Sequence, residues 1–169
     1  MQFRKAKRSD LIKIEAIIPY VVKSGEGKGL NWTSVYPTIN HFERDFEKGE
    51  LYVMASNPEC NEDIVYGAVV LNSDEDINYK KAAWSNSQKA LVPHRLMVNP
   101  EFQRMGNGKR LMTFIEEEGK KRNLKSIRLD TNITNVRAQG LYIKSGFKKV
   151  GVINLEGKIG EFICLEKIL

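Results

Sequence analysis

The residues most clearly suited to chemistry form a glycine-containing loop between an apolar strand and an amphipathic helix. Residues 98–110 read Val-Asn-Pro-Glu-Phe-Gln-Arg-Met-Gly-Asn-Gly-Lys-Arg. Gly106 and Gly108 allow backbone conformations and close approaches that a Cβ atom would block, so successive N–H groups can face one anion. The following helix contributes its unpaired N-terminal donors and the positive end of its dipole, and three side chains add positive charge: Arg104, Lys109 and Arg110. The loop matches neither GxxxxGK[ST] nor GxGxxG, and its two interpretations are an anion site, which we favour, and a structural turn.

The elements that must position this loop follow from apolar spacing, caps and turn residues. Ser9 is the expected cap of the first helix, whose apolar positions run from Leu11 to Ile18 with Pro19 near its end. Thr38 and Gly49 are the expected start and stop of the second helix. The remaining helices are predicted at 108–122 and 135–145, and the strands at 2–7, 51–55, 64–71, 91–98, 126–130, 147–153 and 160–168. Residues 57–61 are expected to connect a hairpin.

Composition limits the classes of protein to consider. The 169 residues include 41% hydrophobic and 28% charged residues, which is typical of about one globular domain. The net charge of +6 favours anionic ligands, but it is scattered, so we expect no nucleic-acid partner. Cys60 and Cys164 are far apart and lack metal-ligand spacing, so neither a disulfide nor a metal is expected. Without an apolar leader or membrane span in the sequence, we expect a cytoplasmic protein that has no membrane partner.

Two blocks of the sequence resemble the GNAT superfamily of N-acetyltransferases. Residues 103–108, Gln-Arg-Met-Gly-Asn-Gly, are similar to that family's [Q/R]-x-x-G-x-[G/A] loop, which holds the pyrophosphate of acetyl-CoA. Residues 135–147 are similar to its N-x-x-A-x-x-[L/F]-Y-x-x-x-G-F signature. The resemblance is strong over residues 90–150, whereas the first half of the chain agrees mainly in the order of its elements.

The resemblance implies an α/β (mixed α+β) fold. The expected architecture is a central mixed, mostly antiparallel, twisted sheet of about six to seven strands, flanked by about four helices. It also implies that residues 1–169 form a single N-acetyltransferase domain, with a cofactor-binding core at about 90–150.

The function implied by the resemblance is transfer of an acetyl group from acetyl-CoA, as cosubstrate, to a primary amine by direct attack in a ternary complex. A small-molecule acceptor is slightly favoured over a protein lysine or N-terminus, and the protein is expected to be a monomer or a homodimer. The alternative is a noncatalytic acyl-CoA-binding or sensor module. A basic nucleic-acid-binding protein is a second rival, suggested only by the net charge.

The resemblance also assigns roles to individual residues. Tyr142 would be the general acid, although packing of its helix is the alternative. The backbone N–H of Val98 would face the thioester oxygen, and Asn135 would touch the pantetheine arm, cap a helix, or do both. The implied cofactor-binding residues are Leu96, Met97, Val98, Gln103, Arg104, Met105, Gly106, Asn107, Gly108, Lys109, Asn135 and Tyr142.

No motif identifies the general base. The unperturbed pKa of His94 suits proton transfer from an amine, but a histidine in a strand is commonly structural. Strand alternation places His94 on the face of Leu96 and Val98 only if the strand has no bulge. Three carboxylates are further candidates for the base: Glu50, Glu62 and Asp130.

Aromatic residues outside the two blocks are candidates for an acceptor pocket. Trp32 and Tyr36 precede the second helix and can present aromatic faces to an amine. Core packing beneath a long loop explains them equally well, and Trp84 has the same alternatives. A dimer interface is a third interpretation of these residues.

Overall fold

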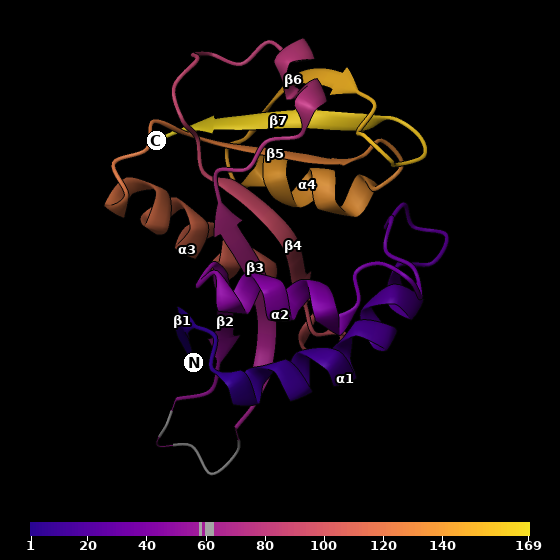
Figure 1. Cartoon of the computed structure of the whole chain (residues 1–169), viewed down its shortest axis with the longest axis vertical. Coiled ribbons are helices and arrows are strands. Elements are labelled where there is room, and N and C mark those ends of the chain that lie inside the picture. Colours follow the sequence, from indigo (N-terminus) through magenta and orange to yellow (C-terminus); the bar gives the residue numbers. More distant parts are fainter. Residues whose placement is uncertain (58, 60–62) are drawn as a thin grey trace. The chain divides into compact units, whose positions relative to one another are not determined.

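The computed structural model describes residues 1–57, 59 and 63–169 (Figure 1). This part of the chain forms two compact units. The first comprises Met1–Glu26, Trp32–Leu71 and His94–Leu111, and the second comprises Gly27–Asn31, Asn72–Pro93 and Met112–Leu169.

A four-stranded sheet is the centre of the first unit. Its strands lie in the order β1 (Gln2–Lys5), β2 (Leu51–Ala55), β3 (Val65–Asn72) and β4 (Val92–Val98). The β1–β2 and β2–β3 pairs are antiparallel, which confirms the predicted hairpin, although part of its connection, including Cys60, lies outside the described residues. All five residues of β2, an internal strand of the sheet, are buried, so both of its faces are covered.

Two helices accompany this sheet: α1 (Arg8–Gly25) contacts α2 (Ile39–Glu47), and α2 contacts β2. The predicted limits of α2 are confirmed, since Thr38 is its N-cap and Gly49 follows it with φ +69°. Gly49 adopts the left-handed conformation that commonly ends a helix.

The predicted cap of α1 is wrong. Lys7, not Ser9, is the N-cap, and Ser9 lies in the first turn. Asp10 decides this start, because its Oδ2 atom accepts hydrogen bonds from the Lys7 N–H at 2.6 Å and from Arg4 Nη1 at 2.6 Å. The helix also continues past Pro19 to Gly25, and buried Val21 extends its apolar face beyond the proline.

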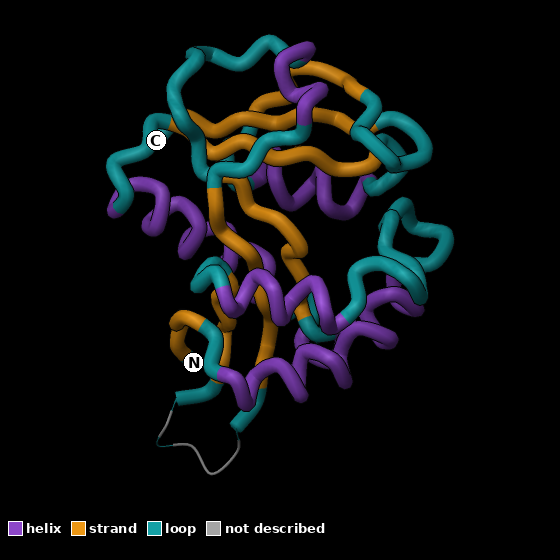
Figure 2. The backbone as a smooth tube through the Cα atoms, viewed as in Figure 1, coloured by secondary structure: helices purple, strands orange, loops and turns teal. Residues whose placement is uncertain are grey.

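A three-stranded antiparallel sheet forms the centre of the second unit. The strand order is β5 (Ser126–Asn132), β7 (Phe162–Ile168) and β6 (Lys148–Ile153) (Figure 2). Leu91, just before β4, forms a parallel bridge with Ile127 of β5. Helices α3 (Asn107–Lys121) and α4 (Val136–Lys144) complete the set of α-helices among the described residues. In the described part of the chain, seven strands and four α-helices in the expected order confirm the predicted fold class.

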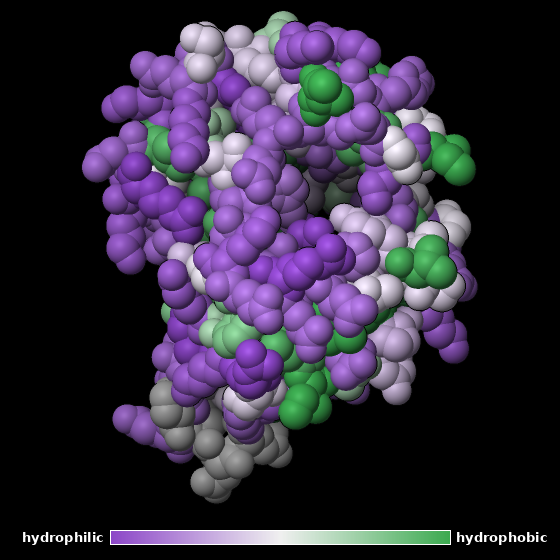
Figure 3. All heavy atoms as spheres, viewed as in Figure 1, coloured by the Kyte–Doolittle hydropathy of each residue, from purple (hydrophilic) through white to green (hydrophobic). Residues whose placement is uncertain are grey.

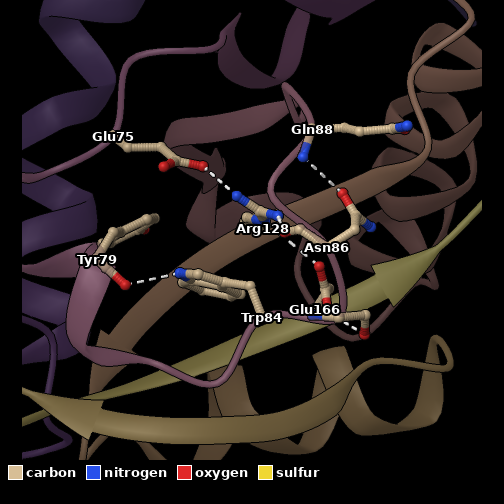
Figure 4. A network of polar contacts seen from close by, with 8 residues as sticks. Glu75, Tyr79, Trp84, Asn86, Gln88, Arg128 and Glu166 are labelled. Atoms are coloured by element: carbon tan, nitrogen blue, oxygen red, sulfur yellow. Dashed lines mark hydrogen bonds and ion pairs between the residues drawn. The ribbon is translucent and has the colours of Figure 1, made fainter.

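The long connection from β3 to β4 is held against the second sheet by an ion-pair network around the buried side chains of Arg128 and Glu166 (Figure 4). The Arg128 guanidinium pairs with Glu166 at 3.3 Å and Glu75 at 2.8 Å, and it donates to the Asn86 carbonyl. Glu166 also accepts hydrogen bonds from the Ser85 N–H and hydroxyl at 2.8 and 2.6 Å. This network fixes the position of the 3₁₀ helix η1 (Ile77–Lys81), which the same connection carries.

The face of the molecule in Figure 3 is mainly hydrophilic, with hydrophobic side chains in scattered groups. No helix among the described residues combines the length and apolar character that a membrane span requires.

Candidate functional site

The glycine loop begins with a short 3₁₀ helix, η2 (Pro100–Phe102), and is braced by two amide side chains. Gln103 Nε2 donates to the Val98 carbonyl at 3.1 Å, and Asn107 Nδ2 donates to the Phe102 carbonyl at 2.8 Å. Asn107 is buried, so its amide stabilises the loop from within. These bonds account for Gln103 and Asn107 as structural residues of the loop.

The loop has the conformation expected of an anion cradle. Gly106 has φ +79°, and a Cβ atom added there would meet no described atom within 4 Å. Arg104 is also left-handed, with φ +63°. Helix α3 begins at Asn107, directly after Gly106, and the first amides of any α-helix lack intrahelical acceptors. The open space, the helix start and the exposed Lys109 together suit a phosphate group.

Strand β4 is continuous from Val92 to Val98, but its backbone is distorted at one residue before the loop. Arg95 has φ +47°, an unfavourable conformation for a residue with a side chain. Side chains therefore do not alternate regularly from His94 to Val98. The strand lacks the regular geometry that would place His94 and Val98 on one face. Gly67 of β3 permits a close approach here, because a Cβ atom there would lie 2.7 Å from the Met97 carbonyl oxygen.

In the second unit, Tyr142 lies on α4 and is 8% exposed. Burial, followed by the negative charge of Asp130, raises the pKa of the Tyr142 phenol. The phenol therefore stays protonated at neutral pH, as a proton donor must. Its ring centroid lies 6.0 Å from that of Phe147, so Tyr142 also packs its helix.

Asp130 of β5 is held by a tyrosine from the β3–β4 connection. Tyr79, which is 2% exposed, donates its hydroxyl hydrogen to Asp130 Oδ1 at 2.6 Å. Burial raises the pKa of the Asp130 carboxyl, with the Tyr79 hydrogen bond acting in the opposite direction. Burial and the adjacent carboxylate raise the pKa of Tyr79 well above its ordinary value. A carboxylate and a buried phenol thus accompany Tyr142 within the second unit.

The start of α4 confirms the capping function of Asn135. Its Oδ1 atom accepts the Ala138 N–H at 3.1 Å. The turn formed by Thr134 and Asn135 lies against Gly29, where an added Cβ atom would overlap their backbone atoms. Gly29 has φ +79°, so both its conformation and its contact exclude a side chain.

Tyr36 belongs to a polar cluster in the first unit. Its ring lies 5.9 Å from the Arg95 guanidinium carbon and 5.0 Å, edge to face, from the His41 ring. Arg95 Nη1 donates to Asp45 Oδ2 at 2.8 Å. The cluster of His41, Asp45 and Arg95 was not predicted from the sequence. Its one signal there is the charged Arg95 within a mostly apolar strand.

The two tryptophans contact core residues. The Trp32 ring lies 6.2 Å from that of buried Phe42. Trp84 donates its Nε1–H to the Tyr79 carbonyl at 2.7 Å, and the Arg128 guanidinium stacks 5.0 Å from its ring. Packing therefore accounts for Trp84, which also borders a buried cluster of the second unit.

Glu50 and Glu62 are the two other carboxylates that the sequence offers as candidates for the base. Glu50 follows α2, where its N–H donates to the Asp45 carbonyl at 3.0 Å. Glu62 lies outside the described residues.

Comparisons with known proteins agree with this architecture. The model of the Acetyltransferase (GNAT) family matches residues 26–147. An acetyltransferase of the GNAT family from Streptococcus agalactiae 2603 is 20% identical with a TM-score of 0.80, over 99% of this chain and 95% of that one. A structure from Staphylococcus aureus Mu50, assigned as an acetyltransferase, is 29% identical with a TM-score of 0.73, over 99% of both chains.

A third similar structure is the NatC complex bound to Gag peptide and CoA. Its matching chain is 16% identical with a TM-score of 0.70, over 99% of this chain and 98% of that one. No curated protein matches the sequence significantly.

Proposed function

The chain belongs to the Acetyltransferase (GNAT) family and is an acyltransferase, and we propose that it transfers an acetyl group from acetyl-CoA to a primary amine. The proposed reaction is a direct attack in a ternary complex. The observation that carries this proposal is the glycine loop, where Gly106 is left-handed beside open space at the start of α3. We further propose that residues 1–169 act as one acetyltransferase domain.

The donor site is assigned to the loop and the end of β4. Backbone amides from Met105 to Lys109 would hold the pyrophosphate, since the α3 N-terminus favours negative charge. Asn135 would contact the pantetheine arm in addition to capping α4. The CoA present in the NatC structure supports this choice of donor.

The chemical step needs three groups from the chain. The amine nitrogen attacks the thioester carbonyl carbon, the new C–N bond forms, and the C–S bond breaks. The Val98 N–H would stabilise the developing oxyanion, and Tyr142 would donate its proton to the departing sulfur. The amine's proton passes to a base, for which His94 is our proposal; it would act through water, because the alternation that would bring it to the face of Val98 is broken at Arg95.

A small-molecule acceptor is favoured over a protein amine. A pocket along α2 in the first unit is lined by charged side chains and is of a size that suits a small polar molecule. The peptide bound in the NatC structure makes a protein N-terminus the alternative acceptor class.

Substitution of Tyr142 by phenylalanine tests the proposed reaction. We expect kcat to fall by about 10²- to 10⁴-fold, because the proton donor is lost. The rise in melting temperature caused by acetyl-CoA should remain, since the ring is kept. Thiol release and mass-spectrometric detection of the acetylated amine measure turnover.

The matched control is Tyr20→Phe, a tyrosine of α1 that is 66% exposed. This variant should keep wild-type turnover. An unchanged kcat in Tyr142→Phe would leave Tyr142 with a packing role only. Absence of any acetyl-CoA-dependent stabilisation in the wild type would contradict the donor site.

A further inference from the structure

A pocket of the first unit lies along α2 and reaches β4. Its volume is about 420 Å³, within the range of about 300–1,000 Å³ typical of small-molecule sites. The lining residues are His41, Arg44, Asp45, Glu47, Lys48 and Arg95. Every one of them has a titratable or charged side chain, so the pocket suits a charged ligand.

The balance of charge in the pocket is positive. Arg44, Lys48 and Arg95 outnumber the two carboxylates, Asp45 and Glu47. Asp45 is 6% exposed and is paired with Arg95, so these two charges cancel and Arg44 and Lys48 remain against Glu47. An anionic group therefore complements the pocket better than a second cation.

Arg95 is fixed in place and still has donors available. Its guanidinium is held by Asp45 at 2.8 Å and by the Tyr36 ring at 5.9 Å. Among the described residues, Asp45 is the one hydrogen-bond partner of the Arg95 guanidinium. The Arg95 Nε atom is buried and has no hydrogen-bond partner there. A guanidinium has five N–H donors in a planar fork that matches a carboxylate.

His41 lines the same wall of the pocket. The Thr38 N–H donates to His41 Nδ1 at 3.1 Å, so the neutral ring carries its proton on Nε2. A neutral histidine with a donating Nε2 is compatible with an oxyanion.

We propose that this pocket binds a carboxylate of the acceptor, and that Arg95 determines the specificity for amines that carry one. This inference rests on the proposed function. Arg95 and Val98 are three residues apart on β4, so the carboxylate held by Arg95 and the thioester carbonyl facing the Val98 N–H would lie at separate points along the strand. The preferred acceptor is therefore an amino acid whose amine and carboxylate are separated by several bonds.

The rival explanation is that the Arg95–Asp45 pair only ties β4 to α2. Both explanations predict that loss of Arg95 reduces stability. They differ in the response to the acceptor's carboxylate, so the test compares acceptors with and without this group.

The experiment uses matched pairs: 6-aminohexanoate with pentylamine, and L-lysine with cadaverine. In the wild type, we expect kcat/KM to be at least about tenfold higher for the carboxylated member. Arg95→Gln should lose this preference through a raised KM for the carboxylated member of each pair. Arg95→Lys should restore it partly, because the charge returns without the fork.

Two further variants separate binding from folding. Asp45→Asn releases Arg95 from its ion pair, and it should keep or increase the preference for 6-aminohexanoate. Lys23→Gln, at an exposed position in the last turn of α1, removes one positive charge outside the pocket and should match the wild type.

Calorimetric binding of 6-aminohexanoate to the acetyl-CoA-free protein makes the result independent of turnover. If the wild type binds 6-aminohexanoate and Arg95→Gln does not, the pocket is supported. Absence of acetylation of every amine would then refute the proposed reaction but not the pocket. Equal use of both members of each pair, or a preference that survives in Arg95→Gln, would overturn the inference.

Discussion

Gly29 shows at the scale of one residue how a loop is held in place. Its φ of +79° lies in the left-handed region, and an added Cβ atom would overlap backbone atoms of Thr134 and Asn135. Gly27, two residues earlier, has φ +66° but no described atom within 4 Å of such a Cβ. The two glycines therefore separate backbone strain from close packing.

We expect Gly27→Ala to lower the free energy of unfolding by about 1 kcal/mol, through strain alone. Gly29→Ala should lose about 1–3 kcal/mol more, because backbone atoms must also move. Urea denaturation measures both values. Equal decreases in the free energy of unfolding for the two variants would contradict this, because the Thr134–Asn135 turn would then accommodate the Cβ atom of residue 29 at no cost.

Arg95 matters at this scale for its backbone conformation as well as for its guanidinium. Its left-handed backbone distorts β4 three residues before Val98. This distortion breaks the side-chain alternation near the proposed oxyanion donor, and strained positions of this kind are frequent at active sites. The proposed carboxylate pocket is one consequence of that geometry.

At the scale of elements, the β3–β4 connection is positioned by buried charge. The side chains of Arg128 and Glu166 are 4% and 2% exposed. The same connection carries Tyr79 to Asp130, so the ion-pair network indirectly determines the surroundings of a carboxylate in the second unit. Removal of one partner leaves the other buried and incompletely paired.

Arg128→Met should therefore lower the free energy of unfolding by about 3–5 kcal/mol. The double variant Arg128→Met/Glu166→Gln should recover part of this loss, since no unpaired buried charge remains. Lys120→Met breaks an ion pair of α3 in which Lys120 is 57% exposed, and it should cost less than about 1 kcal/mol. Denaturant titration compares the three; a single-variant loss as small as that of the Lys120 control would contradict the role assigned to the buried pair.

At the scale of the whole molecule, acidic groups control stability in opposite directions. For Asp10, burial opposes ionisation, but hydrogen bonds from Arg4 and the Lys7 N–H dominate and lower its pKa. For Glu166, burial likewise opposes ionisation, while Ser85 and Arg128 lower the pKa. Burial raises the pKa of Asp45 and of Asp130, so their ionised forms are disfavoured in the folded state, unlike those of Asp10 and Glu166.

A carboxyl with a lowered folded-state pKa stabilises the fold above its unfolded pKa, and this stabilisation is lost as the pH falls through the folded value. The ordinary values are 3.8 for Asp10 and 4.5 for Glu166, so we expect stability to fall as the pH drops below about 4.5. Asp10→Asn should be less stable at pH 7 and show a shallower loss in acid. Unfolding measured from pH 3 to 7 tests this, and an unchanged acid slope would contradict the assignment to Asp10.

Local sequence signals determined much of this protein. Caps, apolar spacing and glycines specified the order of elements, both ends of α2, and the loop before α3, because these signals act within about one helical turn. Two local motifs were also sufficient to indicate the family, since they resemble its loop and its α4 signature.

Only the tertiary structure decided which distant side chains meet. Arg95 pairs with Asp45, fifty residues away, and Tyr79 bonds to Asp130, fifty-one residues away. Asp10 displaced the predicted cap at Ser9 because Arg4, on a neighbouring element, fixes its carboxylate. Packing also accounts for Trp84. Such contacts depend on how strands and helices fold back on one another, which periodicity and caps do not encode.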